Sequence, residues 1–217
     1  QGNPINFKSE QNYLKGMSAF WGGLASTGQV LKPNSGQVYL TGSNPNLNIF
    51  NIDSSYLTKN LGFFLNVPQT STVLLNIVDA NPDKRIRLTN IGFYMAREFM
   101  EKNFIAKDDA QAMLKYLSGK EGLYPHANIL FNFVDAERLL INRIEINGSI
   151  LAPNANVSFG KHSHIDGSLI ANSLFGRGEA HNIRFNGKLP IQPVPEPATI
   201  LLLAGGLLGI AVWRRRY

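Results

Sequence analysis

A near-repeat of seven residues in the second half of the chain constrains the fold more than any other feature. INGSILA at residues 146–152 returns as IDGSLIA at residues 165–171, 19 residues later. In strand-rich sequence, a period of about 20 residues is typical of a β-solenoid, in which each copy forms one coil. The Asn-Gly or Asp-Gly pair of each copy predicts a corner, because a tight turn there needs a positive φ. A weaker third copy, FNGKL, follows at residues 185–189.

The first half of the chain carries short apolar runs separated by Pro, Asn and Gly, a pattern that predicts strands and turns. Asn residues inside these runs are unusual in ordinary strands, but inside a coil an Asn side chain can hydrogen-bond to neighbouring backbone. We therefore predict a mainly β fold, a right-handed β-helix (solenoid). The predicted strands are residues 37–42, 46–52, 63–67, 72–78 and 86–95, and the embedded residues are Asn48, Asn51, Asn66 and Asn76.

Residues 5–25 predict one long helix that packs along the side of the solenoid. Asn6 is placed to cap its start and Gly28 follows its end. A second, short helix is predicted over residues 109–117. The apolar stripe of the long helix consists of Leu14, Met17, Trp21 and Leu24, extended backwards by Phe7.

The last 24 residues contain three features in a fixed order. A rigid turn, Pro195-Glu196-Pro197, is followed by an uncharged run from Ala198 to Trp213, which includes Leu203 and Gly206. Arg214, Arg215 and Arg216 then stop the run. As a helix, these 16 residues span roughly 24 Å, slightly short of a bilayer core, and thinning of the bilayer or snorkelling of the arginines would close the gap. We predict a membrane helix with the arginines on the cytoplasmic side. The alternative, a buried core helix, is disfavoured because nothing follows the arginines to cover it.

This tail resembles the PEP-CTERM sorting signal of Gram-negative bacteria, in which Pro-Glu-Pro, a short membrane helix and a basic cluster end the chain. The resemblance implies that an exosortase, a membrane enzyme similar to a cysteine transpeptidase, removes the tail near Pro195–Pro197. The mature protein would then be released or attached at the cell surface. An exported protein needs a signal peptide, and the chain begins at Gln1 without one. We therefore predict that the chain is N-terminally truncated.

The body resembles the choice-of-anchor A domain, a module that occurs with different C-terminal surface anchors. That resemblance implies an ice-binding-like adhesive β-helix with one long helix alongside. We predict an adhesive domain over residues 1–190, a linker over 191–197, and the membrane helix with its basic tail over 198–217. The matching segments include ILFNF (129–133), GSILAPNA (148–155), DGSLIA (166–171), His181-Asn182 and FNG (185–187).

Composition excludes several chemistries. With no cysteine, the chain forms no disulfide, thiolate metal site or cysteine nucleophile. The formal net charge is +6, of which the tail supplies +2 through three Arg and one Glu. The remaining Lys and Arg are scattered, so we predict no nucleic-acid partner. No phosphate-binding loop or nucleophile elbow occurs in the sequence, and we predict no catalytic, cofactor or metal residues.

Two polar patterns are candidate sites. His162, His164 and Asp166 alternate along a predicted strand, and such a row could bind Zn or Cu; the alternative is a solvent-facing row between coils. His126 and His181 have no predicted partner. The second pattern, Thr70-Ser71-Thr72, resembles part of an ice-binding hydroxyl row, with an ordinary turn as its alternative. Carboxylate pairs occur at Asp108-Asp109 and at Asp135 with Glu137.

The first functional hypothesis is therefore an exported, non-enzymatic surface or matrix protein that is adhesive. Its partners would be the exosortase, the membrane at least transiently, and an exopolysaccharide or another cell's surface. The second is a carbohydrate-active β-helix enzyme, which converging acidic side chains in a cleft would favour. The third is an ice- or crystal-face binder, which needs a regular Thr/Ser array.

Overall fold

The computed structural model describes six stretches of the chain, and the segments predicted as the short helix over 109–117 and as the sorting tail lie outside them. In the part that is described, no helix is long and apolar enough to span a membrane. The described stretches are residues 6–31, 38–57, 62–78, 83–89, 92–95 and 126–192.

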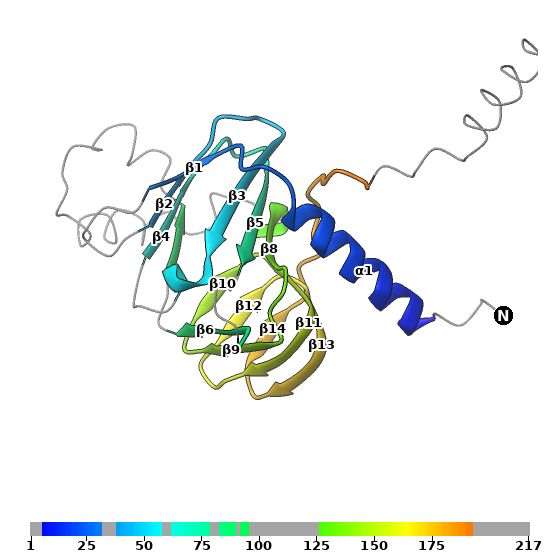
Figure 1. Cartoon of the computed structure of the whole chain (residues 1–217). Coiled ribbons are helices and arrows are strands. Elements are labelled where there is room, and N and C mark those ends of the chain that lie inside the picture. The colour runs from blue at the N-terminus through cyan, green and yellow to red at the C-terminus, as the bar shows by residue number, and fades with distance from the viewer. Residues whose placement is uncertain are drawn as a thin grey trace, which may run out of the picture.

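The described elements are one α-helix, two short 3₁₀ turns and a series of strands (Figure 1). The helical elements are α1 (Phe7–Gly22), η1 (Ser54–Leu57) and η2 (His126–Asn128). The strands are β1 (Gln29–Leu31), β2 (Val38–Thr41), β3 (Leu47–Asp53), β4 (Gly62–Asn66), β5 (Thr72–Val78), β6 (Arg85–Thr89), β7 (Gly92–Met95), β8 (Ile129–Phe133), β9 (Arg138–Asn142), β10 (Glu145–Asn147), β11 (Ser149–Phe159), β12 (His164–Asp166), β13 (Leu169–Gly176) and β14 (Glu179–His181).

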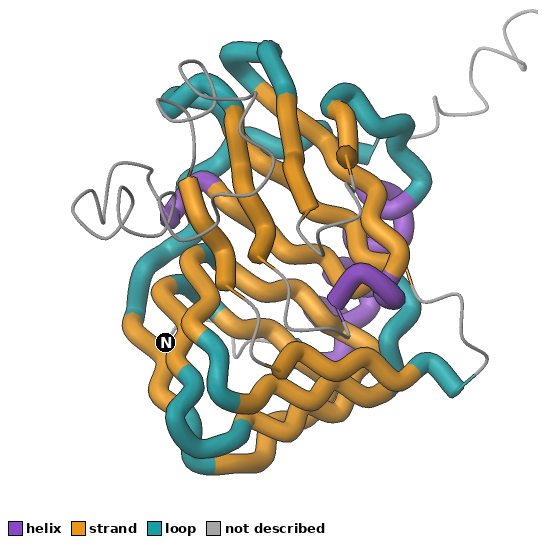
Figure 2. The backbone as a smooth tube through the Cα atoms, turned by 90° about the vertical axis from the view of Figure 1, so that its left-hand side faces the viewer, coloured by secondary structure: helices purple, strands orange, loops and turns teal. Residues whose placement is uncertain are grey.

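The strands stack in parallel, as the predicted coils require. Among the described residues, a 7-stranded curled sheet runs in the order β3-β5-β8-β11-β9-β6, with β13 paired to β11. A 4-stranded sheet, β1-β2-β4-β7, and a 3-stranded sheet, β10-β12-β14, complete the cross-section. In the described part of the chain, the strands pair in parallel, except β1 with β2. Figure 2 shows strands from successive turns of the chain lying side by side.

Long strand β11 produces the curl. Its first part pairs with β8, through Ser149 opposite Leu130, and its last part pairs with β9, through Asn156 opposite Arg138. The register of β11 on β13 shifts between Ala152 and Asn156, where the strand bends. One strand therefore belongs to two differently oriented parts of the same sheet.

The predicted repeat is confirmed by the pairing register. Ile146 lies opposite Ile165 and Ile150 lies opposite Leu169, so the two copies occupy adjacent coils. The predicted third copy is wrong, because residues 185–189 form no strand. Phe185 and Leu189 instead pack on an apolar cluster outside the curled sheet.

The corner of the repeat uses its two glycines in different ways. Gly148 has a φ of +148°, as predicted for a corner. Gly167 is required by contact between the coils, because a Cβ there would lie 2.2 Å from the carbonyl oxygen of Gly148. The prediction of a positive φ was therefore right for one copy only.

The inside of the coils is apolar, since alternate residues of each strand point inward. Phe50, Phe63 and Phe133 are buried there, together with the inward residues of most other strands. The predicted strands over residues 37–42, 46–52, 63–67 and 72–78 agree with β2 to β5, and residues 86–95 contain most of β6 and β7.

Helix α1 begins and ends close to the prediction. The side chain of Asn6 accepts a hydrogen bond from the backbone N–H of Ser9 at 3.1 Å, which confirms the N-cap. The helix ends at Gly22, with Gly23 rather than Gly28 at its C-terminus. Phe7 is 80% exposed, so its assignment to the packed stripe is wrong.

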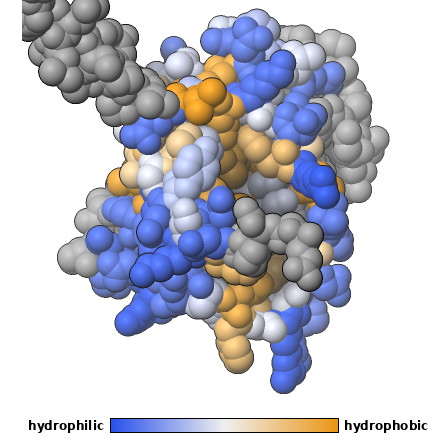
Figure 3. Space-filling model, turned by 90° about the vertical axis from the view of Figure 1, so that its right-hand side faces the viewer, coloured by the Kyte–Doolittle hydropathy of each residue, from blue (hydrophilic) through white to orange (hydrophobic). Residues whose placement is uncertain are grey.

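An apolar cluster on the outer surface of the curled sheet holds α1. Leu14 and Trp21 pack on it from the helix, Leu24 packs on it from just beyond the helix end, and Phe185 and Leu189 pack on it from the segment after β14. The indole Nε1–H of Trp21 also donates to the carbonyl of Pro190 at 2.8 Å, and this bond joins α1 to the segment after β14. Figure 3 shows the molecule from the right-hand side of Figure 1, where hydrophobic side chains lie among hydrophilic ones. The sheet residues of the cluster are Ile49, Leu74, Leu130 and Leu151.

A ladder of three asparagines, Asn51, Asn76 and Asn132, fixes the helix in register with the sheet. They are register partners on β3, β5 and β8. Asn76 donates to the side-chain oxygen of Asn51 at 2.9 Å, and Asn132 donates to that of Asn76 at 2.9 Å. Each amide also donates to a backbone carbonyl in the last turns of α1 or just after it. Asn51 donates to Leu24, Asn76 donates to Trp21, and Asn132 donates to Ser18. Asn51 and Asn76 bond to backbone, as predicted, but they lie between the outer surface of the sheet and α1 rather than inside a coil, and Asn132 was not predicted to take part.

Candidate functional site

The largest group of acid–base side chains in the described residues lies on the outer surface of β10, β12 and β14. We call Glu145, His164, Asp166, Glu179 and His181 the histidine–carboxylate array. Pairing in register places Glu145, His164 and Glu179 in one row, and Asp166 and His181 in the next. Between the rows, Ile146 and Ile165 point inward and are buried, so the array faces outward.

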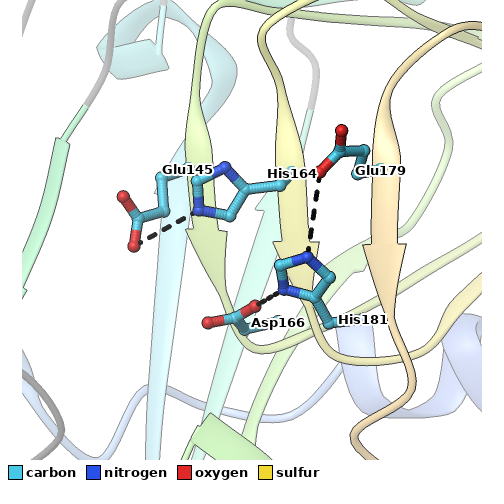
Figure 4. Close-up of polar contacts among 5 residues, drawn as sticks. All are labelled: Glu145, His164, Asp166, Glu179 and His181. Atoms are coloured by element: carbon cyan, nitrogen blue, oxygen red, sulfur yellow. Dashed lines mark hydrogen bonds and ion pairs between the residues drawn. The ribbon is translucent and has the colours of Figure 1, made fainter.

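The five side chains contact one another across neighbouring strands and, for Glu179 and His181, along β14 (Figure 4). His181 Nδ1 lies 2.5 Å from Asp166 Oδ1, and His164 Nε2 lies 3.4 Å from Glu145 Oε1. His181 Nε2 is 4.0 Å from Glu179 Oε2. The two imidazole rings stack with centroids 5.6 Å apart. The carboxylates of Glu145 and Glu179 are 58% and 81% exposed, so the array is open to solvent rather than set in a cleft.

The predicted row of His162, His164 and Asp166 is corrected by the structure. His162 lies in the turn before β12 with a φ of +57° and is not part of the strand. His164 and Asp166 do share one side of β12. His181, which had no predicted partner, supplies the ring beside Asp166. His126 lies in η2.

The array does not gather its donors around one point. Within the described stretches, no group of three or more His, Asp or Glu side chains is arranged to hold a metal ion. Each imidazole instead faces a carboxylate on an adjacent strand. The geometry thus favours the solvent-facing polar row that was the alternative to a metal site.

We expect His181→Ala to lower the free energy of unfolding by less than about 1 kcal/mol, because exposed ion pairs contribute little. Urea denaturation of the wild type and the variant, each with and without Zn²⁺, measures this. A loss of several kcal/mol, or stabilisation by Zn²⁺ that the variant lacks, would contradict the interpretation. His162→Ala is the matched control, because His162 lies in the turn outside the array.

The other predicted patterns do not form a second site. Thr70 lies in a turn, whereas Ser71 and Thr72 are buried at the start of β5, which favours the turn over an exposed hydroxyl row. The hydroxyl of Thr72 accepts the backbone N–H of Lys188 at 2.8 Å. Glu137 pairs with Lys84 at 3.5 Å. Asp108 and Asp109 lie outside the described residues.

The fold is that of a mainly β protein with curled parallel sheets and a single α-helix in the described residues. The chain matches the family model "Putative Ice-binding-like adhesive domain" over residues 1–182. It therefore belongs to this family, in agreement with the resemblance to the choice-of-anchor A domain. Residues 193–216 match the PEP-CTERM protein-sorting motif. Searches of curated proteins and of solved structures found no match. The adhesive-type domain and the sorting motif together support an exported surface protein.

Proposed function

We propose that the protein is a non-enzymatic adhesin of the cell surface or extracellular matrix, delivered by an exosortase. The observation that carries the proposal is the pair of family matches, an adhesive-type domain over residues 1–182 followed by a sorting motif over 193–216. The body would be residues 1–190, the linker 191–197, and the membrane helix with its basic stop 198–217. Its coils would form a right-handed β-helix, since crossovers between parallel strands are nearly always right-handed.

The roles within the tail follow from its chemistry. Pro195, Glu196 and Pro197 form the recognition turn. The run that includes Ala198, Leu203, Gly206 and Trp213 crosses the inner membrane before processing. Arg214, Arg215 and Arg216 hold the chain end in the cytoplasm. After cleavage, the body would remain at the surface or outside the cell.

An adhesive role suits the described surface better than a hydrolytic one. Polysaccharide hydrolysis needs an acid and a second carboxylate placed on either side of a bound sugar. In the histidine–carboxylate array, Asp166 and Glu145 each face an imidazole on an open sheet. Parallel strands held in register and joined to α1 by the asparagine ladder instead offer preformed surfaces for an extended ligand.

Sorting is tested by expressing the full chain in strains with and without the exosortase, and measuring the intact mass and location of the product. We expect an extracellular or surface species that lacks roughly the last 20 residues only where the exosortase is present. Glu196→Ala, within the recognition turn, should reduce processing, and Glu179→Ala on β14 is the matched control. Retention of the tail in the inner membrane in both strains would make the segment a plain anchor and would remove the main support for a surface role.

A further inference from the structure

Three arginines from two distant strands of the sequence meet on one face of the curled sheet. Arg85 and Arg87 lie on β6, and Arg138 lies on β9, directly opposite Arg85 in the parallel pairing. The residues between them on these strands are buried, so all three arginines point outward and are exposed. We call them the arginine face; β6 and β9 lie together at the lower edge of Figure 1.

Among the residues that the structure describes, no carboxylate matches the positive charge of the arginine face. Neighbouring parallel strands lie about 4.8 Å apart, and like charges opposite each other in a sheet destabilise it. The nearest acidic side chains in sequence have other contacts: Glu137 pairs with Lys84 at 3.5 Å, and Asp83 accepts the backbone N–H of Arg85 at 3.3 Å. Within the described residues, no ion pair reaches any of the three guanidinium groups. An anionic ligand would remove this repulsion.

The same face continues from the arginines as an uncharged surface of polar and apolar side chains. In register, Arg138 is followed by Asn156 on β11 and Ser173 on β13. The adjacent row runs from Arg87 through the half-buried Leu140 and through Ser158 to Phe175, which is 82% exposed. Hydroxyl and amide groups beside an exposed aromatic ring suit a sugar, whose hydroxyls accept hydrogen bonds and whose apolar ring face packs on aromatic side chains.

We propose that this surface binds a carboxylated polysaccharide that lies across strands β6, β9, β11 and β13. Each guanidinium group can donate two parallel hydrogen bonds to a carboxylate, a geometry that lysine does not provide. The sugar units beyond the carboxylates would contact Asn156, Ser173 and Phe175. This inference rests on the proposed adhesive function and names its ligand class.

A nucleic acid fits the surface less well. Duplex DNA carries one negative charge per about 1.7 Å of its helix axis and is bound through many phosphate contacts, whereas the basic patch spans only two neighbouring strands before the face becomes neutral. A polymer that carries both carboxylates and many hydroxyls matches both halves of the surface.

The test measures binding of the purified full chain, in mild detergent, to polygalacturonate, to neutral dextran and to duplex DNA. We expect polygalacturonate to bind, with an affinity that falls as salt is raised. The double variant Arg85→Gln/Arg138→Gln should bind at least about tenfold more weakly, since a hydrogen bond to a charged group is worth more than the tenfold step of 1.4 kcal/mol. The single variant Arg138→Lys retains the charge but not the two parallel N–H groups. Its affinity for polygalacturonate should lie between that of the wild type and that of the double variant. Arg184→Gln, an exposed arginine in the segment after β14, is the matched control and should change affinity by less than about twofold.

The inference is overturned if the double variant binds polygalacturonate as the wild type does, if dextran binds equally well, or if DNA is preferred. A surface-adhesion assay on intact cells separates this result from the proposed function. Cells that adhere although the protein does not bind polygalacturonate would overturn only the ligand class. A protein that binds polygalacturonate in solution but is never sorted to the surface would overturn the adhesive role instead.

Discussion

Replacing Asn132 with Ala is expected to lower the free energy of unfolding by roughly 3–5 kcal/mol, the largest effect we expect from a single polar side chain. Asn132 is fully buried between the sheet and α1. Its amide donates to Asn76 and to the carbonyl of Ser18, and its oxygen accepts the hydroxyl of Ser18 at 2.6 Å. Alanine would leave the Asn76 oxygen and the Ser18 hydroxyl without these partners inside the structure, where water cannot replace them easily.

Urea denaturation measures the loss, and hydrogen exchange in α1 shows where it acts. We expect exchange in the C-terminal half of the helix to speed up more than exchange in β5 and β8. Asn132→Asp should also be destabilising, because a carboxylate cannot donate to either acceptor. Asn172→Ala is the matched control: Asn172 hydrogen-bonds to Gln11 and Asn156 at an exposed position. Equal losses for Asn132→Ala and Asn172→Ala would show that the ladder does not anchor the helix.

The elements of this fold could be predicted because their signals are local. Apolar runs bounded by Pro, Asn and Gly define β2 to β5, and a stripe at helical spacing with an Asn cap defines α1. The repeat also predicted the register of two coils, since both copies have the same length. None of these inferences needed contacts between distant segments.

The polar groupings could not be predicted, because the coils differ in length. Asn51 and Asn76 are 25 residues apart, but Asn76 and its next partner Asn132 are 56 apart. Asp166 and His181 are separated by 15 residues, and so fall outside the 19-residue repeat.

The same variation limits what local patterns can predict. FNG at residues 185–187 matches the repeat locally but packs outside the sheet. Arginines that are scattered in the sequence are gathered on the arginine face. A residue's place in the curled parallel sheet depends on the sum of the intervening loop lengths, which local patterns do not report.

Gly167→Ala is expected to cost about 2–4 kcal/mol of stability, although it adds only one methyl group. The new Cβ would lie 2.2 Å from the carbonyl oxygen of Gly148 and 2.8 Å from the backbone nitrogen of Ser149. These are backbone atoms, so no side-chain rotation relieves the clash. The two coils would have to separate at this corner, which weakens the hydrogen bonds from Gly148 N–H to Asp166 and from Ile150 N–H to Ser168.

The identical substitution at Gly16 provides a control of opposite sign. Gly16 lies inside α1, exposed, and a Cβ there meets no atom within 4 Å. Because alanine is the better helix former, Gly16→Ala should raise stability by about 1 kcal/mol. Thermal and urea unfolding of both variants compare them directly. If Gly167→Ala were neutral, the coils could not be stacked as closely as the register of the repeat requires. A loss at Gly167 with a gain at Gly16 would tie the penalty to the corner contact itself, because both variants add the same methyl group.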